Sequence, residues 1–187
     1  SSYSPQTDDE AKALELLRTW DGGTEEDSLG ASIATLAIRH VFYYSDLDGD
    51  GMLTKDPVDA FRRAVRFLVQ HHGRVDVPLG TLQRLRHGQG KTAIDLPLGG
   101  GADILNAAYT KKVGGHLVGI QGDSYVLLVD FTAEGPRSQS IHQYGASLRP
   151  GSPHYSDQAP LFVKRQLKDS YFRPEDLAQN TEASYQP

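Results

Sequence analysis

Apolar residues recur at helical spacing in the first third of the chain. Thr7 and Glu10 have the spacing of a capping box, so a helix is expected to begin there. Its apolar stripe consists of Ala13, Leu14, Leu17 and Trp20. A second helix is expected from residue 27 or 28 to about residue 44. A third begins with Asp56 as its N-cap and Pro57 at the first helical position, where a missing N–H costs nothing.

The second half of the chain has the pattern of a β-hairpin. Residues 125–131 are rich in β-branched and aromatic side chains, which fit a pleated surface. Residues 132–136 predict a five-residue turn, and residues 137–144 predict the returning strand. The other expected elements are a strand at 117–121, a helix near 157–167 and a short helix opened by Pro174.

Helices followed by hairpins predict an α+β fold. We expect three segments. Residues 1–74 form a helical segment that contains an acidic loop resembling an EF-hand. Residues 75–179 form an antiparallel β segment with C-terminal helices, and the polar residues 180–187 form a frayed tail.

Composition narrows the functional class. Of the 187 residues, 38% are hydrophobic, which is low for a self-sufficient globule and fits surfaces meant for a partner chain. The net charge of -5 argues against nucleic acid as a partner. There is no cysteine, so thiolate catalysis and disulfides are excluded. No apolar run reaches the ~20 residues that span a bilayer, and no signal peptide is recognisable.

The acidic loop carries the sharpest local signal. Asp46, Asp48 and Asp50 stand at positions one, three and five of an EF-hand-like loop, and helical patterns flank it. Position twelve, where a bidentate Glu is usual, is Pro57, and we expect Asp59 to substitute. The candidate ligands are Asp46, Asp48, Asp50, Met52 and Asp59. A structural Ca²⁺ site and a plain polar turn both remain open, and no organic cofactor is expected.

Two further constellations have structural interpretations. Ser152, His154 and Asp157 spell a triad, but residues this close on one loop rarely line up from nucleophile to base to orienting carboxylate. We expect this run to pack its loop. The glycines at 99–101 lack the spacing of a phosphate-binding loop and predict a tight backbone passage.

Several stretches, taken in order, resemble the penicillin acylase family of N-terminal-nucleophile hydrolases. They are LRTWDG at 17–22, DSLGA at 27–31, LPLGGGAD at 96–103, GDSYV at 122–126, YGAS at 144–147 and GSPHYSDQ at 151–158. The resemblance covers residues 13–177 and is closest to the branch with acyl-homoserine-lactone and lipopeptide acylases.

The resemblance implies the C-terminal part of the β-chain and a share of a four-layer αββα sandwich. The partners implied are the α-chain and the N-terminal part of the β-chain of the same precursor, with a small N-acyl substrate and a periplasmic or secreted location. In that family a self-processed precursor exposes an N-terminal Ser. The hydroxyl of that Ser attacks an amide, and its own α-amino group serves as the base. Asp130 lies in the strand where the family often has an acidic residue, which implies support for a catalytic histidine on another chain.

The family nucleophile opens a strand, whereas Ser1 is followed by Tyr3, Pro5 and a capped helix. We therefore expect Ser1 to be a tag remnant, a fragment start or a cleavage product. The family's oxyanion Asn also has no match, because Asn106 and Asn180 lie outside that motif. The expected catalytic residues thus lie outside this chain, which should be inactive alone. The alternative function is a calcium-dependent, non-catalytic binding module.

Overall fold

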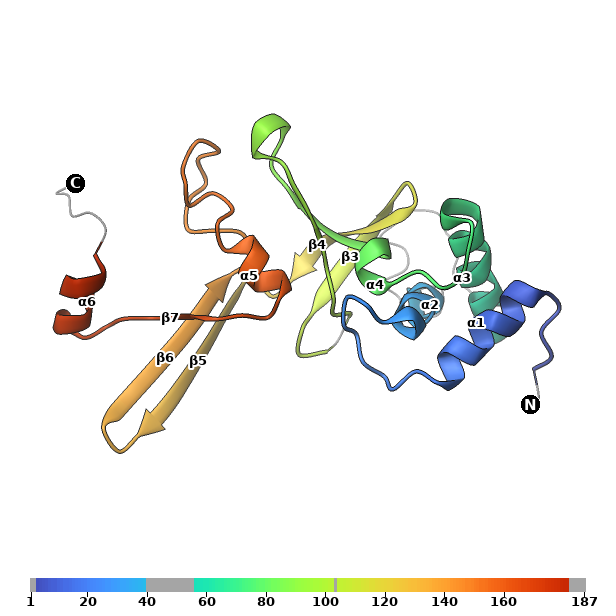
Figure 1. The fold of residues 1–187 in the computed structure, drawn as a ribbon, viewed down its shortest axis with the longest axis horizontal. Helices are drawn as coiled ribbons and strands as arrows, with labels where there is room; N and C mark the ends of the chain where they lie inside the picture. Colours follow the sequence, from blue (N-terminus) through green and yellow to red (C-terminus); the bar gives the residue numbers. More distant parts are fainter. Residues whose placement is uncertain (1–2, 40–55, 103, 182–187) are drawn as a thin grey trace. The chain divides into compact units, whose positions relative to one another are not determined.

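The computed structural model describes residues 3–39, 56–102 and 104–181 and combines helices with β-sheets (Figure 1). The mixed α and β content agrees with the sequence-based fold class. The chain divides into two compact units, Ser1–Asp123 and Ser124–Pro187. The sequence placed its main boundary at residue 74. The compact units divide later because Val75, Leu82 and Leu117 share one core with the preceding helices.

Three helices open the first unit, and local sequence explains their bounds. α1 (Asp8–Arg18) begins after Thr7, whose hydroxyl accepts the Glu10 N–H at 3.1 Å. α2 spans Leu29–Arg39. α3 (Pro57–His72) begins after Asp56, which accepts the Val58 N–H at 2.9 Å, and ends at Gly73 in the left-handed conformation. The predicted caps of α1 and α3 are therefore confirmed.

The sheet of the first unit is mixed rather than antiparallel. The short helix α4 (Leu79–Leu82) leads into β1 (Gln83–His87), and η2 (Gly90–Thr92) connects β1 to β2 (Ile94–Pro97). β3 (Ala108–Val113) and β4 (His116–Gly122) complete the strand order β2-β1-β4-β3. β1 and β4 pair in parallel, which differs from the antiparallel segment expected over 75–179. The chain between them is long enough for the crossover that a parallel pair needs.

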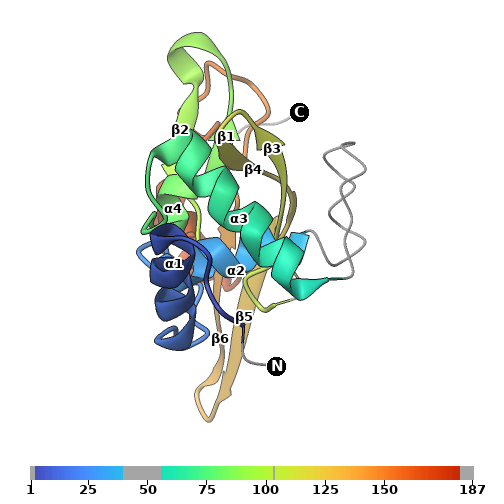
Figure 2. The same cartoon turned by 90° about the vertical axis from the view of Figure 1, so that its right-hand side faces the viewer.

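A hydrophobic core joins the helices of the first unit to its sheet. In Figure 2, α3 lies in front of the strands of this unit. The core side chains are Ala13, Ile33, Leu36, Phe61, Ala64, Val65, Leu68, Val75, Val77, Leu82 and Leu117. Their burial stabilises the unit and fixes the sheet against α1, α2 and α3.

The second unit is built on the predicted hairpin. β5 (Tyr125–Thr132) pairs with β6 (Gly135–His142), and the two-residue β7 (Lys168–Asp169) gives the strand order β5-β6-β7. α5 (Ala159–Val163) packs on β6 through buried Ala159 and Phe162 and is shorter than predicted. α6 spans Pro174–Asn180 and begins at the predicted proline.

The predicted five-residue hairpin loop is wrong. Thr132 pairs with Gly135 and Phe131 pairs with Pro136, so the turn contains only two residues. Gly135 has φ +109, a conformation that glycine adopts at little cost. Pro136 is tolerated because, in the alternation of this ladder, an N–H at its position would point away from β5.

Candidate functional site

Of the predicted calcium ligands, the structure describes Asp59 alone. Asp46, Asp48, Asp50 and Met52 lie outside the described residues. Asp59 lies in the first turn of α3, and its Oδ2 accepts a hydrogen bond from Nε of Arg63 at 2.8 Å. Within the described ranges, no group of three His, Cys, Asp or Glu side chains is placed to hold a metal ion.

Asp130 lies near the end of β5, where its side chain is exposed to solvent. It stands opposite Arg137 of β6 in the hairpin register. Its expected role, support of a catalytic histidine on another chain, stays a prediction.

The Ser152, His154 and Asp157 run organises its own loop. Nδ1 of His154 lies 3.0 Å from Oδ2 of Asp157, and both side chains are partly exposed. The Ser152 hydroxyl oxygen accepts the backbone N–H of His154 at 3.1 Å. The carbonyl oxygen of His154 in turn accepts the N–H of Ser147 at 3.0 Å. These contacts agree with the structural interpretation of the run.

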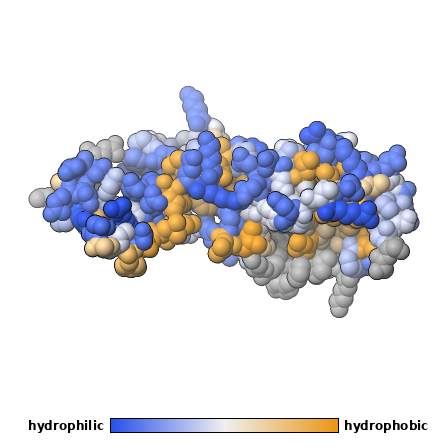
Figure 3. Space-filling model, turned by 60° about the horizontal axis from the view of Figure 1, so that its bottom comes forward, coloured by the Kyte–Doolittle hydropathy of each residue, from blue (hydrophilic) through white to orange (hydrophobic). Residues whose placement is uncertain are grey.

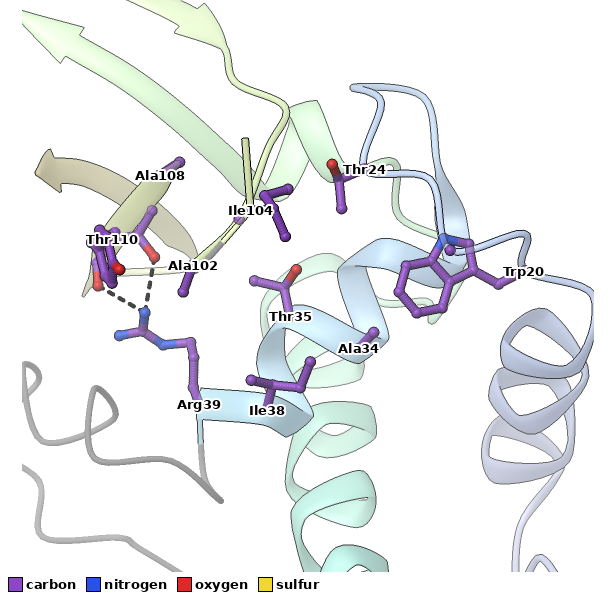
Figure 4. Close-up of a pocket in the computed structure, with 13 residues that line it drawn as sticks. Trp20, Thr24, Ala34, Thr35, Ile38, Arg39, Ala102, Ile104, Ala108 and Thr110 are labelled. Atoms are coloured by element: carbon purple, nitrogen blue, oxygen red, sulfur yellow. Dashed lines mark hydrogen bonds between the residues drawn. The ribbon is translucent and has the colours of Figure 1, made fainter. Parts of the chain in front are cut away.

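An apolar cavity lies in the first unit, between α2, β3, the 20–24 segment and residues 101, 102 and 104 (Figure 4). Its volume is about 180 Å³. Its described lining is Trp20, Gly22, Thr24, Ala34, Thr35, Ile38, Arg39, Gly101, Ala102, Ile104, Ala108, Tyr109 and Thr110. A drug-sized ligand needs a pocket of roughly 300 Å³ or more. The cavity therefore has room for a small apolar group rather than a whole substrate.

Arg39 fixes one end of this cavity. Arg39 is the last residue of α2 and is 7% exposed. Its Nη1 donates to the backbone oxygen of Thr110 at 2.7 Å and to the Thr110 hydroxyl at 2.8 Å (Figure 4). A buried guanidinium that binds a strand in this way ties α2 to β3 beside the cavity.

Gln83 fixes the glycine-rich stretch that leads into the cavity wall. Its side chain is fully buried, and Nε2 donates to the carbonyl oxygens of Leu98, Gly99 and Gly100 at 3.1 to 3.2 Å. At Gly100, with φ +87, an added Cβ would lie 2.3 Å from the Asn106 carbonyl oxygen. The predicted tight backbone passage is therefore confirmed.

Sequence reasoning found the apolar role of Trp20 but missed Arg39 and Gln83. Arg39 closes a helix at a position that reads as solvent-facing, and Gln83 opens a strand with no local pattern around it. Their partners lie 71 and 15 to 17 residues away along the chain. A buried polar side chain with a distant backbone partner leaves no periodic signal in one sequence.

Three charged side chains of β1 and β2 form a cluster. Asp95 of β2 contacts Nε of Arg84 at 2.7 Å and Nε of Arg86 at 3.1 Å. Burial alone would raise the pKa of Asp95, but the hydrogen bond from Arg84 and the two positive charges outweigh it and lower that pKa. The pKa of His116 is lowered by burial and by the nearby charge of Arg86. The cluster of Asp95, Arg84 and Arg86 links β2 to β1, and none of its residues lines the cavity.

Comparisons with known proteins agree on one family. The model of the family described as Penicillin amidase matches residues 2–179. The acyl-homoserine lactone acylase PvdQ of Pseudomonas putida is 36% identical over 93 residues, which cover 47% of this chain and 12% of that protein. The protein of the same name from Pseudomonas syringae is 26% identical over 193 residues, covering 91% of this chain and 25% of that protein. The chain thus spans a quarter or less of the length of these relatives.

A solved structure, the thermostable penicillin G acylase from Alcaligenes faecalis, matches 98% of this chain and 43% of its own. Its sequence identity is 13% and its TM-score is 0.41. In the described part of the chain, no helix combines the length and apolarity needed to cross a membrane.

Proposed function

Because this chain belongs to the penicillin amidase family, we propose that it is a segment of an acylase that hydrolyses the amide bond of an N-acyl substrate. The observation that carries this proposal is the family match over residues 2–179, which is nearly the whole chain. The chain supplies the C-terminal part of the β-chain, and its partners are the α-chain and the remainder of the β-chain. The mixed helices and sheets of both units serve as portions of a four-layer αββα sandwich.

The attacking group lies outside these residues. A serine hydroxyl needs a base within hydrogen-bond reach, and an α-amine with a reference pKa near ~8 can accept its proton. An N-terminal Ser contributed by another part of the enzyme supplies both the hydroxyl and the amine that acts as its base. Hydrogen-bond donors around the reacting carbonyl then stabilise the oxyanion. Ser152 is a poor alternative nucleophile. Its hydroxyl oxygen accepts the backbone N–H of His154 and so helps to hold the conformation of its own loop.

The substrate class follows from the relatives and from the apolar cavity. The relatives from Pseudomonas are named as acyl-homoserine lactone acylases, so an acyl-homoserine lactone is the first candidate. Lipopeptides and β-lactams are the other candidates. Trp20, Ile38 and Ile104 give the cavity an apolar lining that suits the end of an acyl chain. Quorum quenching and a periplasmic or secreted location belong to this proposal.

Activity assays on two forms of the protein test the proposal. The complete precursor should hydrolyse an N-acyl-homoserine lactone, and the purified 187-residue chain should not. Robust hydrolysis by the 187-residue chain that is lost in Ser1→Ala or Ser152→Ala would contradict it. The Thr19→Ala variant, on the exposed end of α1, serves as a control that leaves turnover unchanged.

A calcium role for the acidic loop is a separate proposal that rests on spacing. Asp46, Asp48, Asp50 and Met52, completed by Asp59, would hold Ca²⁺ and join α2 to α3. Asp59 would then have to share its carboxylate with Arg63, which lies 2.8 Å from it. Calcium titration should raise the melting temperature of the chain, and Asp48→Asn should abolish that rise while Asp9→Asn leaves it intact. A melting temperature that is independent of calcium would exclude the site.

A further inference from the structure

β5 is the end strand of its sheet within the described residues. The sheet order is β5-β6-β7, so β6 covers one edge of β5. The other edge, called here the outer edge, carries the backbone groups of β5 that do not point to β6. A strand that presents such groups can pair with a further strand.

Two observations identify which residues point to the outer edge. Paired residues of an antiparallel ladder alternate between hydrogen-bonded and non-hydrogen-bonded pairs. Thr132 and Gly135 close the two-residue turn, and at the opposite end the Gln143 N–H donates to the Ser124 oxygen at 3.0 Å. Even-numbered residues of β5 therefore bond to β6, and the N–H groups of Leu127 and Val129 point to the outer edge.

The same odd-numbered residues carry an exposed apolar stripe. Tyr125, Leu127 and Val129 are 44% to 49% exposed and Phe131 is 84% exposed. Side chains two residues apart share a face of a strand, so these four form one continuous surface, called here the outer stripe. Figure 3 shows that residues of high hydropathy, coloured orange, are exposed on the molecular surface.

The two ends of this sheet are built differently. At the far end, β7 has only Lys168 and Asp169, and a short charged edge strand resists further pairing. β5 has eight residues and contains neither proline, glycine nor lysine. Its one charged residue, Asp130, lies on the face opposite the outer stripe. β5 thus lacks the features that prevent an edge strand from pairing with a further strand. An apolar run of this kind is typical of an interior strand.

We propose that an extended strand from the part of the enzyme outside these 187 residues pairs with the outer edge of β5 and that the enzyme buries the outer stripe. The occupant follows from length. A relative that aligns with 91% of this chain is about four times as long, because the match covers 25% of it. The surface of β5 is then an interior surface of the complete enzyme. This inference rests on the proposed function, since it requires that larger enzyme.

Amide hydrogen exchange at single-residue resolution tests the pairing in the complete enzyme. The amides of Leu128 and Asp130, which bond to β6, serve as internal controls and should exchange slowly. The exchange rates of the Leu127 and Val129 amides should be at least about 100-fold lower than those of amides on an unpaired, solvent-exposed strand edge. Fast exchange at Leu127 and Val129 beside slow exchange at the two controls would overturn the proposal. Because no turnover is measured, the result is independent of the enzymatic activity.

A cross-linking experiment identifies the occupant. Phe131→p-benzoylphenylalanine in the complete enzyme places a photoreactive ring in the outer stripe. We expect the cross-linked peptide to come from outside residues 1–187. A cross-link within these residues, or to a second copy of this chain, would overturn the proposal. The matched control, Leu128→p-benzoylphenylalanine, probes the opposite face and should give a different peptide.

Discussion

At the residue scale, buried polar side chains add hydrogen bonds to segments that pack beside the hydrophobic core. Glu10 joins the residues before α1 to α3. Its Oε2 accepts hydrogen bonds from the Tyr3 hydroxyl at 2.6 Å and the Gln6 N–H at 2.7 Å, and its Oε1 lies 3.4 Å from Nε of Arg62. These hydrogen bonds, the Tyr3 bond first, lower the pKa of Glu10, and the charge of Arg62 adds to the effect against the opposing effect of burial.

Replacing Glu10 should give a pH-dependent loss of stability. Glu10→Gln should destabilise the chain by about 1–2 kcal/mol at neutral pH, because charge-assisted hydrogen bonds are lost. The folded-state pKa lies below the unfolded value of 4.5, so this contribution is full above that pH and disappears as the pH falls through the folded pKa. Urea unfolding of wild type and Glu10→Gln at neutral pH and at about pH 3 measures the difference between their unfolding free energies. A difference that is larger at the acidic pH would contradict this account.

Gln83 offers a second test, because its amide nitrogen lies within hydrogen-bond distance of three backbone carbonyl oxygens. Gln83→Leu should cost about 2–3 kcal/mol, since buried acceptors lose their donor. Gln83→Glu should cost more, because a carboxylate oxygen would face those carbonyls. The exposed amide of Gln139, which donates to Asp169, gives the control Gln139→Leu, expected to change stability by no more than ~0.5 kcal/mol. Equal unfolding free energies for wild type and Gln83→Glu would refute the assigned role.

At the element scale, helix ends are set locally and sheet pairing is not. The caps at Thr7 and Asp56 were predictable because a capping side chain and its partner lie within three residues. The parallel pair β1–β4 was not, because its strands lie far apart along the chain and share no pattern. The hairpin was found from its apolar run, but its turn was misjudged because Gly135 and Pro136 read as turn residues and are strand residues here.

The α3 cap gives a prediction at this scale. Asp56→Ala removes the acceptor of the Val58 N–H and should destabilise the chain by about 1 kcal/mol. Asp9 lies in the first turn of α1 but outside its cap. Asp9→Ala should destabilise the chain by only about 0.3 kcal/mol, because it removes a negative charge near the positive end of the helix dipole. Thermal unfolding of both variants compares them, and an equal shift would argue that the cap is unimportant.

At the scale of the whole molecule, both compact units carry surfaces suited to a larger assembly. Phe131 and Leu128 are large apolar side chains left exposed on β5, and the apolar cavity of the first unit is small for a complete substrate. The resemblance to penicillin acylases was visible in the sequence because its motifs keep their order, and the family match confirms it. Asp130 and the calcium ligands remain predictions, since their partners or neighbours lie outside the described residues.

Locating the acyl-enzyme adduct tests the central claim most directly. The complete enzyme is treated with an acylating substrate, quenched in acid during turnover and digested, and the acylated residue is mapped by mass spectrometry. We expect the acyl group on an N-terminal serine outside these 187 residues. An adduct on Ser152, or on any other residue of this chain, would contradict the claim that these elements frame an active site whose nucleophile comes from elsewhere.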